Sequence, residues 1–116
     1  MRKKTHRSLD LANKVKEELE ENLDAHDMSI TWLSRKVGCN RTKLADVFKA
    51  EYQETPMRWL KKKRMHQAQR LLVTTELSVQ EIAFRVGYLD ANNFSTAFKQ
   101  VIGSSPVQYK RQYQDQ

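Results

Sequence analysis

The segment SVQEIAFRVG at residues 78–87 repeats an earlier segment, SITWLSRKVG, at residues 29–38. The serine, the apolar positions, one basic position and the closing glycine coincide at an offset of 49 residues. After one inserted residue the match continues at an offset of 50, where Leu44 pairs with Phe94 and Phe48 with Phe98. Self-similarity at a fixed spacing is typical of duplicated structural units. The chain therefore contains two copies of one small unit.

Each copy is predicted to form a helix, a tight turn and a second helix. In the second copy, Ser78 and Glu81 have the spacing of a capping box, and Gly87 supplies a left-handed stop after the apolar positions. The next helix is expected to begin near Asn40 in one copy and Asp90 in the other, because both residue types cap helix N-termini. Its apolar pair, spaced four residues apart, is expected to face inward. These patterns predict one helix-turn-helix per copy.

Helix signals outside the two copies complete the predicted fold. An apolar stripe at steps of four residues predicts an amphipathic helix before the first copy, formed by Leu11, Val15, Leu19 and Leu23. A cap followed by proline, at 55–56 and again at 105–106, starts another helix after each copy. The stretch 56–73 contains no Gly and no internal Pro, which predicts one connecting helix. We expect an all-α protein of about seven helices, with two homeodomain-like helix-turn-helix bundles joined by that helix.

The predicted organisation has five parts. They are a basic N-terminal tail at 1–8, a first helix-turn-helix unit at 9–54, the connecting helix at 55–73, a second unit at 74–112 and a C-terminal tail at 113–116. The chain holds only 3 Gly and 2 Pro in 116 residues, which argues against disorder and turn-rich β structure. No apolar run approaches the roughly 18 residues of a membrane span. We therefore expect a cytoplasmic protein with no membrane partner.

Positive charge is concentrated in the middle of the chain. Residues 29–64 carry 10 basic and 3 acidic side chains, whereas residues 1–28 carry 6 and 7 and residues 65–116 carry 5 and 4. A compact basic region in an otherwise balanced chain favours a surface that binds a polyanion, and nucleic acid is the leading candidate. The basic run at 61–64 has a second interpretation, a solvated helix face.

Residues suited to catalysis or metal binding do not cluster in the sequence. The lone cysteine, Cys39, has no partner for a disulfide, and a plain turn thiol is favoured over a redox switch. The three histidines are scattered without metal-ligand spacing, and no nucleophile–base arrangement or Gly-rich phosphate loop is present. Trp32 and Trp59 are expected to belong to the core or its rim. The sequence predicts no enzyme, no cofactor and no metal site.

One further pattern connects the chain with a known family. The segment 64–72, the second copy and the closing residues of that copy together resemble the C-terminal signature of the AraC/XylS family of bacterial transcription regulators. The resemblance covers roughly residues 9–112 and rests on the joint spacing of Ala68, Leu72, Ile82, Ala83, Gly87, Tyr88, Phe94, Phe98 and Pro106. It implies a seven-helix DNA-binding domain that recruits RNA polymerase at promoters, usually as an activator. It further implies a stand-alone monomer on an asymmetric site or, alternatively, a domain excised from a longer regulator.

The second helix of each copy supplies the candidate DNA contacts, because an α-helix fits the major groove and its outward side chains reach base edges. The candidate base-contacting residues are Thr42, Ala45 and Asp46, which fall where the family reads bases, and Asn92, Asn93 and Thr96 in the second copy. The candidate phosphate-contacting residues are Arg35, Lys36, Arg41, Lys43, Lys49, Arg85 and Lys99.

Several of these side chains have a competing structural role. Asparagine can pair with adenine through two hydrogen bonds, but it is equally suited to capping the start of a helix, which applies to Asn92 and Asn93. Asp46 would have to accept a hydrogen bond from cytosine, or it pairs with Lys43 or Lys49 one turn away. Ala45 can contact only a thymine methyl group. We therefore expect the first copy to contribute more through phosphate contacts than through base recognition.

The leading hypothesis is a sequence-specific transcription regulator that reads two adjacent major-groove segments of double-stranded DNA. One alternative is an interaction module that contacts RNA polymerase or another regulator without reading DNA. Another is a non-specific nucleic-acid binder driven by the basic middle segment. A connecting helix of about 18 residues spans about 27 Å, less than the ~34–36 Å between successive major grooves. If both helices bind, either the DNA bends or one unit binds weakly.

Overall fold

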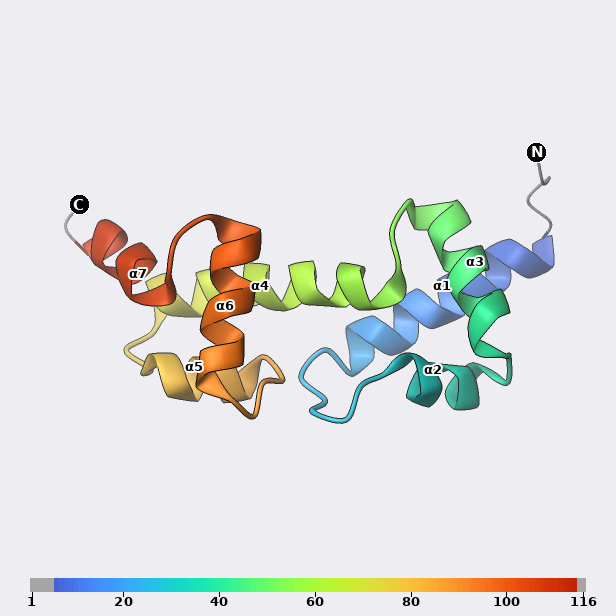
Figure 1. Cartoon of the computed structure of the whole chain (residues 1–116), viewed down its shortest axis with the longest axis horizontal. Coiled ribbons are helices and arrows are strands. Elements are labelled where there is room, and N and C mark those ends of the chain that lie inside the picture. Colours follow the sequence, from blue (N-terminus) through green and yellow to red (C-terminus); the bar gives the residue numbers. More distant parts are fainter. Residues whose placement is uncertain (1–5, 115–116) are drawn as a thin grey trace. The chain divides into compact units, whose positions relative to one another are not determined.

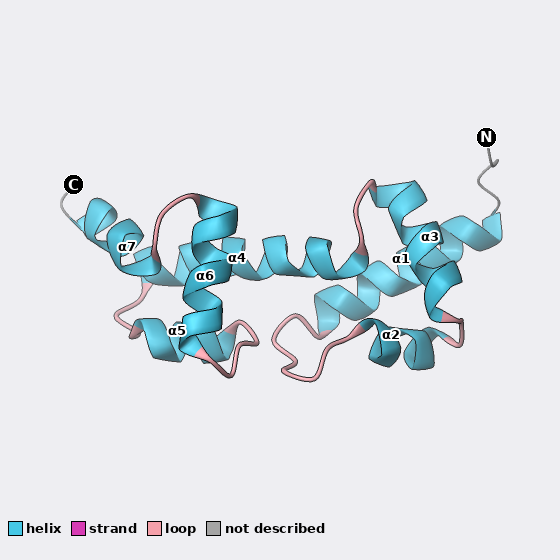
Figure 2. Cartoon of the chain, viewed as in Figure 1, coloured by secondary structure: helices cyan, strands magenta, loops and turns pink. Residues whose placement is uncertain are grey.

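The computed structural model describes residues 6–114 and contains, in that part of the chain, seven α-helices and no strand (Figures 1 and 2). The helices are α1 (His6–Glu21), α2 (Ile30–Val37), α3 (Arg41–Tyr52), α4 (Pro56–Thr74), α5 (Val79–Arg85), α6 (Ala91–Ile102) and α7 (Pro106–Gln114). The expected all-α class is confirmed. None of the described helices is both long and apolar enough to span a membrane.

The predicted tails fall partly outside the described residues. Residues 1–5 and 115–116 are not described, whereas residues 6–8 already belong to α1 and residues 113–114 to α7. The N-terminal helix also ends earlier than its apolar stripe suggested. Leu23, the last member of that stripe, lies beyond the end of α1 at Glu21.

The chain divides into two compact units, each of which contains one helix-turn-helix. Unit 1 comprises Met1–Asn22 and Asp27–Leu60, with α2 and α3 as its helix pair, and unit 2 comprises Leu23–His26 and Lys61–Gln116, with α5 and α6. The boundary falls inside α4. The short segment 23–26, which the sequence placed with the first helix-turn-helix, belongs to unit 2.

The core of unit 1 is built from the apolar faces of α1, α2 and α3. Val15 and Leu19 of α1 are fully buried, as are Leu33 of α2 and the α3 pair Leu44 and Phe48. The Phe48 ring lies 6.3 Å from the Trp59 ring in an edge-to-face arrangement, a geometry that aromatic pairs prefer. Trp59 is only 7% exposed, which confirms its expected core position.

The core of unit 2 centres on the aromatic pair of α6. Phe94 and Phe98 are fully buried, with ring centroids 5.8 Å apart. They belong to one hydrophobic cluster with residues of α4 and α5. Those two helices, including the C-cap of α5, contribute Met65, Ala68, Leu72, Ile82, Ala83 and Val86. Tyr109 of α7 closes the cluster, with its ring 5.7 Å from that of Phe98. The i, i+4 spacing of the two phenylalanines therefore fixes which face of α6 is buried.

Side-chain caps begin the second helix of each pair, as the sequence predicts. Asn40 accepts a hydrogen bond from the backbone N–H of Lys43 at 2.8 Å, and Asp90 caps α6 in the same way. The capping box of α5 is complete. Gly38 ends α2 with a left-handed φ of 68°, whereas α3 ends on Gln53 with a φ of 62°. Glycine is the usual residue at such a left-handed helix end, so the sequence pattern does not predict that α3 ends at Gln53.

Gly87, in the turn between α5 and α6, is required by both its backbone angle and its surroundings. Its φ is +100°, a region that residues with a Cβ rarely occupy. A Cβ at this position would lie 2.7 Å from Cζ of Arg64. The Arg64 guanidinium cannot withdraw freely, because it donates hydrogen bonds to the carbonyls of Leu23 and Ala25, both at 2.7 Å. The turn therefore depends on glycine.

Gly103 offers a matched comparison, since its φ is also +100° but nothing lies within 4 Å of the position of an added Cβ. We expect Gly103→Ala to lower the free energy of unfolding by about 1–2 kcal/mol, the cost of left-handed backbone. Gly87→Ala should cost an additional ~1.5–3 kcal/mol, because Arg64 must give up hydrogen bonds made by a charged group. Urea unfolding of both variants measures the difference. Equal losses would contradict the role assigned to Arg64.

Candidate nucleic-acid interface

The exposed face of α6 carries the strongest base-contact candidates. Burial of Phe94, Ala97 and Phe98 leaves Asn92, Asn93, Thr96 and Lys99 exposed. Asn92, Thr96 and Lys99 follow one another at spacings of four and three residues, so they line one side of the helix. Two amides, a hydroxyl and a cation thus share the solvent-facing surface of this helix.

The cap of α6 bears on one of the two roles open to the asparagines, the capping of the helix. Oδ1 of Asp90 accepts hydrogen bonds from the backbone N–H groups of Asn92 at 2.7 Å and Asn93 at 3.0 Å. Because the Asp90 carboxylate performs the capping, the side-chain amides of Asn92 and Asn93 are not needed for it. Both remain on the exposed surface at the start of the helix. Their capping alternative is therefore not realised.

Thr96 is partly committed within the helix. Its hydroxyl donates a hydrogen bond to the carbonyl oxygen of Asn92 at 3.1 Å, one turn earlier. Bonds of this kind are common for threonine inside helices. The hydroxyl oxygen can still accept a hydrogen bond, and the methyl group still offers apolar contact. Thr96 therefore has fewer ways to contact a base than the neighbouring asparagines.

The corresponding face of α3 is less suited to base recognition. Thr42 and Asp46 are exposed, but Ala45 is half-buried. The expected alternative for Asp46, an ion pair with Lys43 or Lys49, is not present among the described residues. The Asp46 carboxylate therefore faces solvent without a cationic partner in that part of the chain, where it would repel a phosphate backbone.

All the candidate phosphate-contacting side chains are exposed. In unit 1 they are Arg35, Lys36, Arg41, Lys43 and Lys49, and in unit 2 Arg85 and Lys99. The Lys36 ammonium also lies 5.4 Å from the centroid of the half-buried Trp32 ring. This cation–π contact, between two residues of α2, holds the Lys36 side chain against the Trp32 ring and leaves it open to solvent. Unit 1 therefore carries more of the candidate phosphate-contacting cations than unit 2.

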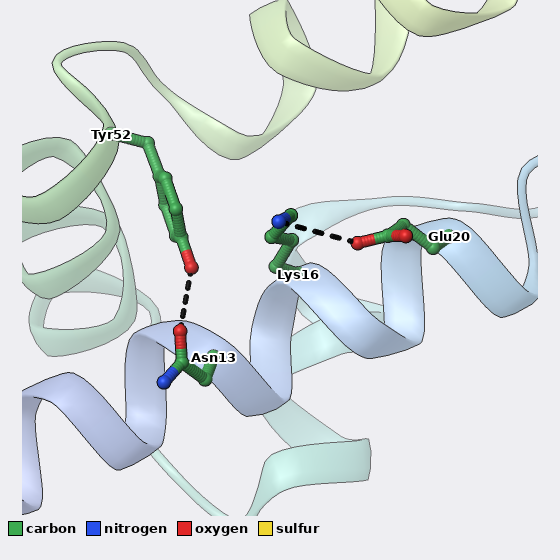
Figure 3. Close-up of polar contacts among 4 residues, drawn as sticks. All are labelled: Asn13, Lys16, Glu20 and Tyr52. Carbon is green, nitrogen blue, oxygen red and sulfur yellow. Dashed lines mark hydrogen bonds and ion pairs between the residues drawn. The ribbon is translucent and has the colours of Figure 1, made fainter.

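The C-terminal end of α3 is fixed to α1 by a polar contact that the sequence did not reveal (Figure 3). The Tyr52 hydroxyl donates a hydrogen bond to Oδ1 of Asn13 at 2.7 Å, and the Lys16 ammonium lies 5.6 Å from the Tyr52 ring centroid. Lys16 also pairs with Glu20 at 3.7 Å. Desolvation raises the pKa of Tyr52 above its ordinary value. These contacts anchor the recognition helix of unit 1.

Arg64 has a positioning role that sequence analysis missed, because it was grouped with the basic run at 61–64. The side chain is half-buried, and desolvation lowers its pKa from the ordinary arginine value, although it stays charged. Besides its two carbonyl partners, it lies 5.7 Å from the Tyr88 ring centroid. Close by, Nε2 of His26 lies 2.9 Å from the Phe84 carbonyl oxygen. These contacts join segment 23–26 to the turn before α6.

Groups capable of other chemistry are not assembled in the described residues. No cluster of three or more His, Cys, Asp or Glu side chains is placed to hold a metal ion within residues 6–114. Cys39 is a free, half-buried thiol whose Sγ lies 3.4 Å from the carbonyl oxygen of Asn40.

The family model of a helix-turn-helix domain matches residues 33–112 of the chain, which include most of the first pair and all of the second. The chain belongs to the AraC-type helix-turn-helix family. This confirms the resemblance inferred from the spacing of the second copy.

Relatives and solved structures of this family agree with the fold. The transcriptional activator NphR of Rhodococcus is 32% identical over 108 residues, which cover 93% of this chain and 32% of NphR. The C-terminal domain of the response regulator yesN from Fusobacterium nucleatum has a TM-score of 0.83 at 33% identity and covers 87% of this chain and 98% of that one. The chain spans about a quarter to a third of the length of the curated relatives it matches first.

One similar structure includes nucleic acid. The DNA-binding domain of AdpA, a global transcriptional factor, was solved in complex with a target DNA. It has a TM-score of 0.83 at 29% identity, covering 90% of this chain and 93% of that one. A domain of closely similar fold therefore binds a target DNA in that protein's complex.

Proposed function

We propose that this chain is a sequence-specific domain of a bacterial transcription regulator, in which α3 and α6 each enter one segment of the major groove of double-stranded DNA. One observation carries the proposal. The exposed amides of Asn92 and Asn93 stand at the start of α6, while Asp90 performs the capping. An asparagine amide matches the N6 and N7 edge of adenine with two hydrogen bonds. Asn92 and Asn93 are the principal base readers.

The first unit contributes mainly affinity. Its exposed cations meet phosphates, which fix the register of a protein on DNA but carry no sequence information. Ala45 and Asp46 offer one apolar contact and one acceptor, so the base recognition by α3 is restricted to a thymine methyl or a cytosine amino group. The two units therefore differ in role although they derive from one repeated sequence.

The wider regulatory role follows from the same arrangement and from the family. Two helix-turn-helix units within one chain bind an asymmetric site as a monomer, without the two-fold symmetry that dimers require. The relatives NphR and RhaR are transcriptional activators by name. We assign activation of transcription to this chain as well, with contact to RNA polymerase at promoters. This role places it in the cytoplasm, at the nucleoid. Its role is binding, not catalysis.

In-vitro selection of duplexes from a random library, with excess competitor DNA at near-physiological salt, tests the proposed function. We expect an asymmetric motif over about two helical turns. A motif of half that length would show that one unit only contacts phosphates. Binding that falls steeply with salt to one level on every duplex would indicate a non-specific binder. A lack of any enrichment would contradict DNA reading and leave the interaction module.

Alanine variants separate base reading from phosphate contact on the selected duplex. Asn92→Ala and Asn93→Ala should each reduce discrimination between bases by ~1–3 kcal/mol at defined base pairs. Lys49→Ala should weaken binding to all duplexes alike and lower the salt dependence of binding. Titration of single-base-substituted duplexes measures both effects. If the asparagine variants discriminated between bases as the unmodified chain does, their assignment as readers would be wrong.

A further inference from the structure

Leu89 is the most exposed large hydrophobic side chain that the structure describes, with 76% of its surface accessible. A single exposed leucine is ordinary on a protein surface, so exposure alone assigns it no role. Its place in the chain is less ordinary. It lies in the turn between α5 and α6, directly before the Asp90 cap and three residues before Asn92.

An apolar residue directly before a helix cap often packs against the first turn of the helix, and Leu89 does not. The residue before a helix cap often packs against the fourth helical residue, which here is Phe94. Phe94 is fully buried, but in this turn it packs against the ring of Tyr88, 5.8 Å away in an edge-to-face arrangement. Tyr88 is held there by its own backbone N–H, which donates to the Ala83 carbonyl at 2.9 Å. Tyr88 thus fixes the entry into α6, and Leu89 is left outside the core.

The two repeats differ in the length of this turn. In unit 1 a single residue, Cys39, separates the left-handed Gly38 from the Asn40 cap. In unit 2 two residues, Tyr88 and Leu89, separate the left-handed Gly87 from the Asp90 cap. The longer turn of the second repeat has room for both a half-buried ring, Tyr88, and an exposed apolar side chain, Leu89, directly before the cap of α6.

We propose that Leu89 is a specificity residue, whose side chain packs against the C5 methyl group of a thymine beside the base pairs read by Asn92 and Asn93. The inference rests on the proposed function. In the major groove only thymine presents a methyl group, so an apolar side chain that contacts it distinguishes thymine from the other bases. Asp90 accepts hydrogen bonds from the backbone N–H groups of Asn92 and Asn93, and Leu89 precedes Asp90 directly. The exposed side chains of Leu89, Asn92 and Asn93 therefore belong to one capped turn.

Replacement of thymine by deoxyuridine tests this contact, because it removes the methyl group and leaves base pairing unchanged. Each thymine of the selected duplex is replaced in turn, and the affinity of the unmodified chain is measured by titration. We expect one position in the segment read by α6 to lose affinity about three- to fivefold, the factor for one methyl group leaving an apolar contact. Leu89→Ala should lose a similar factor on the original duplex and become indifferent to deoxyuridine at that position.

Two variants control the experiment. Leu89→Met keeps an apolar side chain and should keep the thymine sensitivity, whereas Val73→Ala removes another exposed aliphatic group, 48% accessible, and should change neither quantity. Thymine contacts made by Ala45 or Thr96 would persist in Leu89→Ala and are thereby distinguished from that of Leu89.

The results that overturn the inference are distinct from failure of the proposed function. If Leu89→Ala kept the full deoxyuridine effect at every thymine, or no thymine in that segment were sensitive, Leu89 would not read DNA. Its exposed side chain would then belong to a surface for a protein partner, together with Phe84 in the hollow of about 500 Å³ that both residues line. If the unmodified chain selected no motif, the proposed function would fail before any Leu89 variant was measured, and this inference with it.

Discussion

Burial of one aromatic pair, Phe94 and Phe98, determines which face of α6 is available for binding. Their spacing of four residues commits one side of the helix to the core of unit 2 and turns Asn92 and Asn93 to solvent. Leu44 and Phe48 impose the same division on α3. The hydrophobic effect thus orients each recognition helix, and a single capping side chain then fixes where the helix begins.

The turn before α6 is held by contacts between residues that are far apart in the chain. Arg64 reaches the carbonyls of Leu23 and Ala25 and lies against Gly87, which has no side chain to obstruct it. Desolvation lowers the pKa of Arg64. The same desolvation makes its hydrogen bonds costly to lose, because a partly buried guanidinium without acceptors destabilises the folded state. The turn that leads into the exposed face of α6 therefore depends on a half-buried cation.

Local signals account for what the sequence predicted well. Capping residues, prolines at helix starts and glycine stops act within one turn, so the helices and the family could be recognised from the order of residues alone. Contacts between distant residues, and helix ends without a glycine stop, could not be predicted from the sequence. The contacts of Arg64 span 39 and 41 residues, and Gln53 ends α3 in a left-handed conformation without a glycine. The sequence also could not show which side chain caps α6, and in the structure the Asp90 carboxylate accepts the hydrogen bonds from the backbone N–H groups of Asn92 and Asn93.

Hydroxyl-radical footprinting of the selected duplex, with the protein-to-DNA ratio determined in parallel, tests the central claim that one chain presents two recognition helices to DNA. We expect one chain per duplex and two protected segments whose centres lie about 10 base pairs apart, one helical turn. Because unit 1 is expected to contact mainly phosphates, its segment should be protected at least as strongly as that of unit 2. A single protected segment, or two chains on one duplex, would contradict that claim.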